Sequence, residues 1–486
     1  MKKLTLFYFI LFFINFSCKK DSSNVLLNEI TTIENNLLPA IHVTGDSIKT
    51  YNLTERMKYY NIPGVSIAIV ENGQLKWAKG YGISDTETGK KVDSNTLFQA
   101  GSISKPVAAL AVLKLAEENK VNLDQDVNTY LQDWKVPENT LTQGEKVTLR
   151  KLLTHTAGMT VHGFPGYKQT DTFPTTTDVL NGLGNTPKIT IDTIPGSIWR
   201  YSGGGYTVMQ KVVEEVTKQS FEDYINTAIL QPFNMKNSTY SQPIDSTKYT
   251  NISAAYNRKG KIIEGKWNNY PEKAAAGLWT TPSDLAKYCT EIQQISKENK
   301  KGVLHKKTVE AMLTKHKNNW GLGPSLQWES DSLVFRHGGK NAGFTNEMIA
   351  FAHRGNAVIV MTNADNGGKL IGEVLRGVSQ YYKWGVSNQQ AIKAVEIPIE
   401  TLNEYTGTYQ LNFQVPNIGD YFVEITIKNN HLCIYDPNNG ELNILTPTAP
   451  STFIDTDTGE KVSIQSENNN LAMIFNNRYT FYRVKN

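Results

Sequence analysis

The sequence predicts an α+β fold, in which an antiparallel sheet is flanked by helices and joined to a helical lobe, followed by a small all-β barrel domain. Within residues 46–385, strand-like segments gather at both ends and helix-like segments lie between them, the order typical of such an α+β arrangement. Beyond residue 400 the pattern changes to short strands separated by Asn, Gly and Pro turns, as in a small barrel or sandwich. The length of 486 residues also exceeds that of one small domain.

The first 17 residues are predicted to be a signal peptide. Two lysines open the segment, and residues 4–16 are apolar but too few to span a membrane comfortably as a mature helix. A serine precedes Cys18, so the segment resembles a bacterial lipoprotein signal, in which Cys18 is lipidated and becomes the mature N-terminus. The Asn-Phe pair at 15–16 departs from that pattern, and a cleaved secretory signal with an incidental cysteine is the alternative.

Either kind of signal takes the mature protein out of a bacterial cytoplasm. With a lipid on Cys18, we expect an outer-membrane lipoprotein that faces the periplasm or the cell surface. Residues 18–45 would then be a polar tether, because Lys, Asp, Ser and Asn dominate its start. No other segment of the sequence is apolar enough to span a membrane.

Residues 46–385 carry the elements of the α+β domain. The apolar runs 65–70 and 75–80 are separated by Asn72-Gly73, which predicts a β-hairpin. Thr, Pro and Gly are frequent over 163–195, so we expect a long irregular excursion that borders a cleft. The other predicted elements are helices at 107–115, 148–153, 206–216, 283–295 and 368–383, and late strands at 333–337, 347–351 and 357–363.

The C-terminal part is predicted to be a separate β domain. A linker is expected over 386–400, and the β domain over 401–486. Its strand candidates alternate apolar and polar residues between turn signals, at 421–427, 431–435, 461–464 and 479–484.

Composition argues against several classes of protein. The net charge is +4 and the lysines are scattered, so no basic stripe suits nucleic acid. The three cysteines lie far apart, and His155, His162 and His337 show no ligand spacing, so we expect neither a metal site nor a cofactor. A disulfide could only join Cys289 to Cys433, and we expect both thiols to be free.

The strongest chemical signal is the segment Ser102-Ile103-Ser104-Lys105. A serine hydroxyl needs a base within hydrogen-bond reach to act as a nucleophile, and residues three apart on a helix share one face. An apolar run follows Lys105, and burial would lower the pKa of its amine until it could accept the hydroxyl proton. Taken alone, however, Ser-x-x-Lys is also compatible with an ordinary helix start.

Two further motifs point to the same chemistry. Tyr201-Ser202-Gly203 opens a glycine-rich helix start, and a phenol beside a lysine amine can act as a general acid or base. His337-Gly338-Gly339-Lys340 follows a strand, where glycines would let a substrate lie against the strand edge. Read separately, Tyr201 could simply pack in the core and His337 could be a structural histidine.

In this order, Ser-x-x-Lys, Tyr-Ser-Gly and His-Gly-Gly resemble the serine β-lactamase/penicillin-binding protein superfamily, and closely its branch of esterases and D-amino-acid-specific peptidases. The resemblance covers residues 50–385 and extends to 152–158, 195–196, 276–285 and 337–344. The segment that begins at Tyr405 resembles the lipocalin-like domain often appended to this branch.

The resemblance implies an acyl-enzyme mechanism. Ser102 would attack a carbonyl while Lys105 and Tyr201 carry its proton to the leaving group, and water would then release the acyl group with Tyr201 as base. The backbone N–H groups of Ser102 and Lys340 would hold the oxyanion. The implied site therefore comprises the catalytic residues Ser102, Lys105 and Tyr201, and the oxyanion and substrate-binding residues Gly203, His337, Gly339 and Lys340.

Two departures from the superfamily pattern bear on the substrate. Gly203 stands where β-lactamases and penicillin-binding proteins place an asparagine that holds the substrate amide. His337 stands where they carry a lysine, and a histidine is mostly neutral at pH 7. Both changes favour small carboxylic esters as substrates. The alternatives are D-amino-acid amides or peptides, weak penicillin-binding or β-lactamase activity, and an inactive scaffold that binds a ligand.

Overall fold

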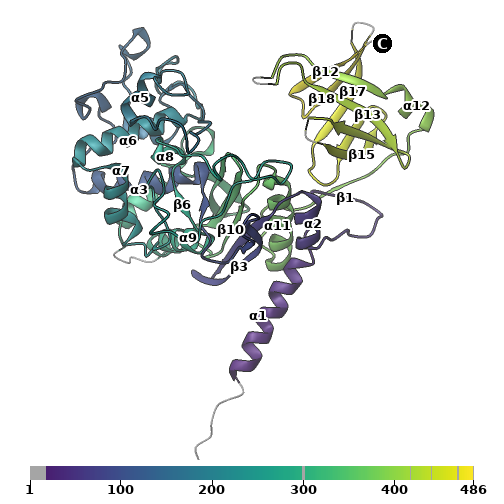
Figure 1. The fold of residues 1–486 in the computed structure, drawn as a ribbon, viewed down its shortest axis with the longest axis horizontal. Helices are drawn as coiled ribbons and strands as arrows, with labels where there is room; N and C mark the ends of the chain where they lie inside the picture. Colours follow the sequence, from purple (N-terminus) through teal and green to yellow (C-terminus); the bar gives the residue numbers. More distant parts are fainter. Residues whose placement is uncertain (1–17, 298–301, 416–417, 439, 468–469, 485–486) are drawn as a thin grey trace, which may run out of the picture.

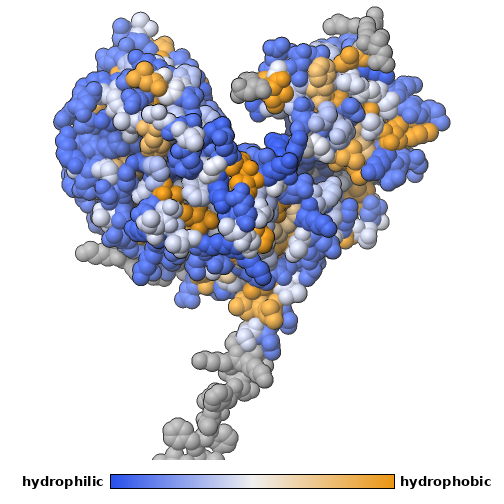
Figure 2. Space-filling model, in the orientation of Figure 1, coloured by the Kyte–Doolittle hydropathy of each residue, from blue (hydrophilic) through white to orange (hydrophobic). Residues whose placement is uncertain are grey.

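The computed structural model describes residues 18–297, 302–415, 418–438, 440–467 and 470–484. They form an α+β body and a C-terminal β-barrel that stands beside it (Figure 1), and the space-filling view shows a hollow between the two parts (Figure 2). The predicted fold class is confirmed. The signal peptide predicted over residues 1–17 lies outside the described residues.

The body is built on an antiparallel sheet of seven strands. The strands that the sequence places early and late in this domain pair directly, because β2 lies beside β10. In spatial order they are β4 (Lys90–Lys91), β3 (Gln74–Asp85), β2 (Gly64–Glu71), β10 (Ala357–Thr362), β9 (Phe344–Phe351), β8 (Ser332–Asn341) and β7 (Ser325–Glu329).

The hairpin of β2 and β3 forms where Asn72-Gly73 predicts it. Both turn residues have positive φ, 53° and 72°, as a tight hairpin turn requires. Successive residues of β2 point to opposite faces of the sheet. Ile67 and Ile69 pack into one apolar cluster, whereas Ala68 and Val70 pack into the other, so the sheet is buried on both sides.

Helices cover both faces of the sheet. One face is covered by α2 (Leu53–Tyr59) and α11 (Gly367–Tyr382), and the other by α9 (Pro282–Lys297) and the buried helix α3 (Ser104–Glu117). A helical lobe continues from the second face (Figure 1). Its helices are α4 (Leu149–Leu153), α5 (Thr176–Asn181), α6 (Gly203–Thr217), α7 (Phe221–Ile225), α8 (Lys273–Ala276) and α10 (Lys306–Met312), with short turns η1 (Gly101–Ile103), η2 (Val127–Thr129), η3 (Thr140–Thr142), η4 (Asn226–Leu230) and η5 (Lys317–Asn319).

The expected tether and linker both carry regular structure. Helix α1 (Cys18–Glu34) projects from the body (Figure 1), and its C-terminal half docks there, with Glu29 accepting a 3.1 Å hydrogen bond from Trp77. Strand β1 (Ile41–Val43) pairs in parallel with β11 (Gln390–Ile392). The sequence analysis expected connecting segments here because a pairing between two distant three-residue strands leaves no local pattern in the sequence.

The C-terminal domain is a closed barrel of eight strands. Helix α12 (Ile399–Glu404) precedes it, and apolar residues of every strand converge on one core. The strands are β12 (Gly407–Leu411), β13 (Phe422–Lys428), β14 (His431–Asp436), β15 (Glu441–Ala449), β16 (Thr452–Asp455), β17 (Lys461–Glu467), β18 (Asn470–Phe475) and β19 (Tyr479–Arg483). A small two-stranded sheet in the body joins β5 (Phe98–Gln99) to β6 (Trp279–Thr280).

Cys289 and Cys433 are both buried and free, which confirms the expectation for their thiols. Within the described ranges, no cluster of three or more His, Cys, Asp and Glu side chains has the geometry to hold a metal ion. Among the described helices, none combines the length and apolarity needed to cross a bilayer.

Candidate active site

Ser102 lies in a tight turn that leads directly into α3. It occupies the short helix η1 and is half-buried, between the buried residues Gly101 and Ile103. The next serine fixes this turn, because Ser104 Oγ donates to Gly101 O at 2.6 Å and accepts from Leu278 N at 3.0 Å. The nucleophile candidate is therefore held by a braced backbone at the start of a buried helix.

Lys105 is the base that the sequence places one turn after Ser102. Its Nζ lies 3.1 Å from Ser102 Oγ and 2.8 Å from the carbonyl oxygen of Ala275. The side chain is 2% exposed, and this burial lowers the pKa of the amine to about 7. Because no carboxylate pairs with it among the described residues, the amine can be neutral at physiological pH and accept a proton.

Tyr201 lies two residues before α6, and the Lys105 amine lies over its ring. Lys105 Nζ lies 4.9 Å from the centroid of its ring. Its hydroxyl is buried and has no hydrogen-bond partner within normal geometry among the described residues. Burial raises the pKa of this phenol, and the nearby Ser102 hydroxyl partly opposes the increase. The free protein therefore presents Tyr201 as a neutral phenol, ready to donate a proton.

His155 supports Tyr201, and sequence reasoning missed this role. The ring of His155 lies 4.2 Å from that of Tyr201, tilted by 31°. Its Nδ1 accepts a 3.1 Å hydrogen bond from Ser202 N, so the neutral ring carries its proton on Nε2. Burial and the charge of Lys105 hold the pKa of His155 well below its usual value. His155 belongs to the segment 152–158 that carries the family resemblance, which was the sequence signal available for it, and its backbone is left-handed, with φ 57°.

His337 is neutral in the structure, as the sequence analysis expected. It is 5% exposed, and burial together with the charge of Lys105 lowers its pKa to about 3. Its Nδ1 lies 2.6 Å from Gly338 O, which assigns the proton to Nδ1 and leaves Nε2 as an acceptor. That Nε2, like Tyr201 Oη and His155 Nε2, is buried without a partner among the described residues.

The backbone of strand β8 packs directly against η1. A Cβ on Gly101 would lie 2.5 Å from Lys340 N, and one on Gly339 would lie 1.9 Å from Ala100 O. Glycine is required at both positions, and Gly101 also has φ +55°. The structure thus places the backbone of Lys340 beside the turn that carries Ser102, where two N–H groups could face one oxyanion.

Gly203 occupies the first turn of α6, close to Tyr201, and the structure leaves no room for a side chain at this position. A Cβ there would lie 2.8 Å from Phe164 Cε2 and 3.1 Å from His162 O. The irregular excursion after residue 163 therefore fills the space into which a longer side chain at 203 would extend.

Two tryptophans complete the surroundings of Tyr201. Trp320 lies 5.8 Å from the Tyr201 ring and 5.6 Å from the His337 ring, and Trp199 lies 5.3 Å from Trp320. Both come from irregular segments, so no periodic pattern marked them. The structure brings together Ser102, Lys105, Tyr201, His337, Gly339 and Lys340, with Gly203 adjoining them, whereas Cys18 lies at the start of the projecting helix α1.

The fold and these motifs define a member of the β-lactamase family. The sequence model described as Beta-lactamase matches residues 51–376, more than half of the chain, and the chain belongs to this family. A similar relative is Protein flp from Staphylococcus aureus (strain N315), which is 30% identical over 234 residues; these cover 48% of this chain and 44% of the relative. Another is a teichoic acid D-alanine hydrolase from Staphylococcus aureus, which is 32% identical over 230 residues; these cover 47% of this chain and 54% of the relative. The chain spans about half the length of the curated relatives it matches.

Solved structures share the fold. The octameric penicillin-binding protein homologue from Pyrococcus abyssi has a TM-score of 0.61 and 21% identity, covering 89% of this chain and 98% of its own. FmtA from Staphylococcus aureus has a TM-score of 0.54 and 22% identity, and the match covers 78% of this chain and 100% of FmtA. Family membership supports a serine hydrolase.

Proposed function

We propose that this chain is an exported serine hydrolase that acts through an acyl-enzyme on Ser102, with small carboxylic esters as its substrates. The observation that carries the proposal is the 3.1 Å contact between Lys105 Nζ and Ser102 Oγ, made by an amine whose pKa burial lowers to about 7. A nucleophile and a neutral base within hydrogen-bond distance are the minimum that acyl transfer requires.

In the acylation step, Lys105 takes the proton of Ser102 as Oγ attacks the ester carbonyl. The backbone N–H groups of Ser102 and Lys340 stabilise the oxyanion, and one such donor contributes about 10²–10³ in rate. The C–O bond of the ester then breaks, and the leaving alcohol takes the proton of Tyr201. The step ends with a protonated Lys105 beside a Tyr201 phenolate, a pair of opposite charges in a buried site.

Deacylation runs through the same groups in reverse. The Tyr201 phenolate takes a proton from water, and the hydroxide attacks the acyl carbonyl. Protonated Lys105 then returns its proton to Ser102 Oγ as the acid product leaves. Tyr201 is thus the acid of the first step and the base of the second, a role reversal that other two-step hydrolases also use.

Two features of the site support an ester over an amide or a β-lactam. The neutral His337 supplies no fixed positive charge for a substrate carboxylate. Gly203 has no side-chain amide to hold a substrate amide, and Phe164 lies where a longer side chain would extend. Both features keep the chemistry of Ser102 intact while weakening recognition of peptides and penicillins.

A second candidate is hydrolysis of a D-amino-acid derivative. It is favoured by the similarity to the relative named teichoic acid D-alanine hydrolase, 32% identical over 230 residues. An inactive scaffold is disfavoured, because Ser102, Lys105 and Tyr201 are all present and brought together.

We also propose export with a lipid anchor on Cys18. The charged and apolar start of the chain and the serine before Cys18 support it. Metabolic labelling with a palmitate analogue is expected to mark the wild type but not Cys18→Ala. An unlabelled wild type that is still exported would indicate simple secretion.

The decisive experiment compares p-nitrophenyl acetate and butyrate with nitrocefin and D-alanine p-nitroanilide, using the wild type and Ser102→Ala. We expect ester turnover that disappears in Ser102→Ala, with little nitrocefin cleavage. Preference for the D-alanine anilide would favour the second candidate. If the wild type hydrolysed none of these substrates and did not react with a fluorophosphonate label, the inactive scaffold would be the supported alternative.

A further inference from the structure

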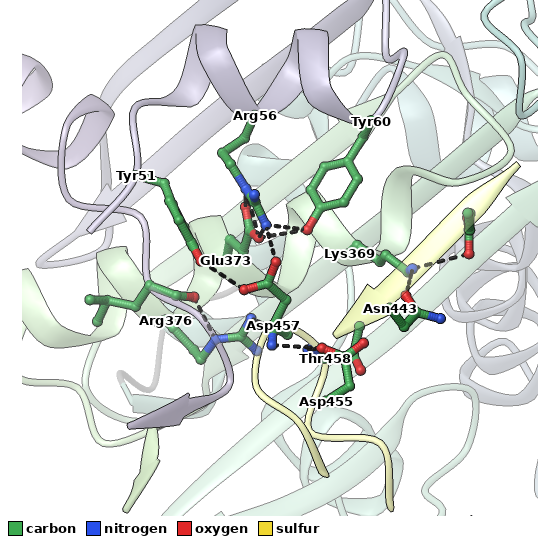
Figure 3. A network of polar contacts seen from close by, with 12 residues as sticks. Tyr51, Arg56, Tyr60, Lys369, Glu373, Arg376, Asn443, Asp455, Asp457 and Thr458 are labelled. Carbon is green, nitrogen blue, oxygen red and sulfur yellow. Dashed lines mark hydrogen bonds and ion pairs between the residues drawn. The ribbon is translucent and has the colours of Figure 1, made fainter. Parts of the chain in front are cut away.

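The barrel is held against the catalytic body by a polar network (Figure 3). Arg56 of α2 bonds the carboxylate of Glu373 on α11, with Nε at 2.9 and 3.0 Å from its two oxygens, and its Nη2 lies 2.8 Å from Asp457 in the β16–β17 turn. Tyr51 donates to the same aspartate at 2.7 Å. Lys369 of α11 adds a 3.0 Å ion pair to Glu441 of β15. These contacts determine which end of the barrel faces the body.

The end that faces the body opens into a cavity of about 600 Å³. This volume lies within the usual range of small-molecule sites, about 300–1,000 Å³. Its deep part is the barrel interior and is apolar, and its mouth is polar and shared with the catalytic body. The apolar wall consists of Leu411, Val423, Ile434, Met473, Phe475 and Phe481.

This cavity coincides with a gap in the packing of the barrel core. Val423 and Met473 are almost fully buried, at 5% and 1% exposure, yet they face the cavity. The other half of the barrel interior is filled by side chains such as Phe453 and Val462, which do not line the cavity. The interior of an eight-stranded barrel can be filled by side chains or can hold one small ligand. In this barrel, side chains fill only part of the interior.

The mouth of the cavity presents hydrogen-bond donors that have no anionic partner. Arg258 is exposed and pairs with no carboxylate among the described residues. Lys340 Nζ bonds only a backbone carbonyl there, Asp365 O at 2.8 Å. Both cations line the mouth of the cavity, and burial lowers the pKa of Lys340.

The carboxylates around the mouth already accept hydrogen bonds. Asp365 accepts from Gly343 N at 2.9 Å, and Asp436 accepts from Asn438 N at 2.9 Å and from Tyr421. Glu441 is paired with Lys369, and burial raises the pKa of Glu460. The lining carries three cations and four carboxylates, so its net charge does not favour an anion. The unused donors of Arg258 and Lys340 are therefore the groups that would select the head group.

We propose that this cavity binds a single-chain amphipathic anion, with its aliphatic tail in the barrel and its anionic head group at Arg258 and Lys340. The barrel supplies the apolar surface, whereas the catalytic body supplies the head-group donors. The site exists only while the two domains are docked as the network of Arg56 and Asp457 holds them. Ser102 does not line the cavity, whereas Lys340 does. Lys340 would contribute its side chain to the head group and its backbone N–H to the proposed oxyanion site.

The test is calorimetric titration of the full chain with dodecanoate, dodecyl phosphate, dodecanol and dodecylamine. We expect dodecanoate to bind once per chain with a negative heat-capacity change, the mark of apolar burial. Dodecyl phosphate distinguishes a phosphate head from a carboxylate head, and tighter binding of either supports the site. Failure of both anions to bind, or tighter binding of dodecylamine, would overturn the proposal.

Paired variants separate the head group from the tail. Arg258→Gln should weaken dodecanoate about tenfold, since a hydrogen bond to a charged group is worth that much, while dodecanol changes less than twofold. Lys259→Gln removes the same charge one residue away, outside the cavity, and should change neither. Equal losses in Arg258→Gln and Lys259→Gln would contradict recognition by Arg258.

A second pair of variants tests the barrel interior. Val423→Phe should fill the cavity and weaken the binding of both dodecanoate and dodecanol. Ile427→Phe lies four residues along the same strand and packs on the barrel core but does not line the cavity, so it should leave binding intact. Fluorophosphonate labelling of Ser102 and a thermal melt check that each variant is folded. Unchanged binding in a folded Val423→Phe would place the ligand elsewhere.

Discussion

The rings of His155 and Tyr201 lie 4.2 Å apart, and His155 also accepts the backbone N–H of the residue after Tyr201. One buried side chain thus contacts the ring of the proposed acid and accepts the N–H of the next residue. His155 is 3% exposed and touches neither Ser102 nor Lys105 by any described hydrogen bond. It is a positioning residue whose effect on the reaction passes through Tyr201.

Replacing His155 should therefore impair turnover in two separable ways. His155→Ala removes both the ring contact and the acceptor, leaves Ser202 N–H buried and unpaired at a cost of about 1–3 kcal/mol, and should lower both kcat and stability. His155→Asn retains a side-chain acceptor and tolerates the positive φ of 57°. It should recover most of the stability but not the kcat. If His155→Asn restored kcat as well, the ring contact would have no role in catalysis.

Gly101→Ala should reduce turnover because its methyl group would collide with the backbone N of Lys340, 2.5 Å away. Displacing one oxyanion donor costs about 10²–10³ in rate. Gly89→Ala is the control: Gly89 has φ +72° and nothing within 4 Å of an added Cβ, so it carries the backbone strain of about 1–2 kcal/mol alone. Ester kinetics and melting temperatures of both variants distinguish the two effects. Full activity in a folded Gly101→Ala would exclude Lys340 N as a donor.

Much of this site follows from local sequence signals. Asn72-Gly73 predicted its hairpin because two positive-φ residues suffice for the turn. Ser102 and Lys105 were predictable because helical spacing alone brings them to one face. Gly339 was predicted from the motif. Glycine is required there because a Cβ would lie 1.9 Å from Ala100 O.

Features that depend on contacts between distant segments were not predictable in the same way. The Arg56–Asp457 pair joins residues 401 positions apart, and the pairing of β1 with β11 joins two segments expected to be connections. The support of Tyr201 by His155 and Trp320 likewise depends on tertiary packing. No periodicity or composition within one segment carries that information.

The pH dependence of turnover should follow Lys105. Since the base must be neutral, kcat/KM should rise about tenfold per pH unit below the pKa of about 7 and level off above it. His337 does not contribute in this range because its pKa is about 3. Ester kinetics from pH 5 to pH 9 provide the measurement. A profile that keeps rising to pH 9 would show that the amine keeps a higher pKa.

The lowered pKa of Lys105 also makes the stability of the fold depend on pH, in a window above pH 7. The folded-state pKa of Lys105 lies below its ordinary 10.5, so the unfolded chain binds more protons between about pH 7 and 10.5. Stability contributed by this group therefore rises with pH across that window, by at most about 1.4 kcal/mol per unit. Lys105→Met lacks the titration, and its urea stability relative to wild type should decline from pH 7 to pH 9.5. A difference that stays constant with pH would contradict the shift.

The network between the domains predicts unequal costs for its two charged partners. Arg56→Met leaves Glu373, whose side chain is 0% exposed, without its cation, and breaking a buried pair this way costs about 3–5 kcal/mol. Asp457→Asn removes a carboxylate that is 25% exposed and should cost about 1 kcal/mol.

Burial already raises the pKa of Glu373 against the opposing effect of Arg56. Without Arg56 the folded state holds this proton more tightly, so the deficit of Arg56→Met should widen from pH 5 to pH 8. Urea unfolding at both pH values measures it, and equal costs for the two variants would mean that Glu373 finds another partner.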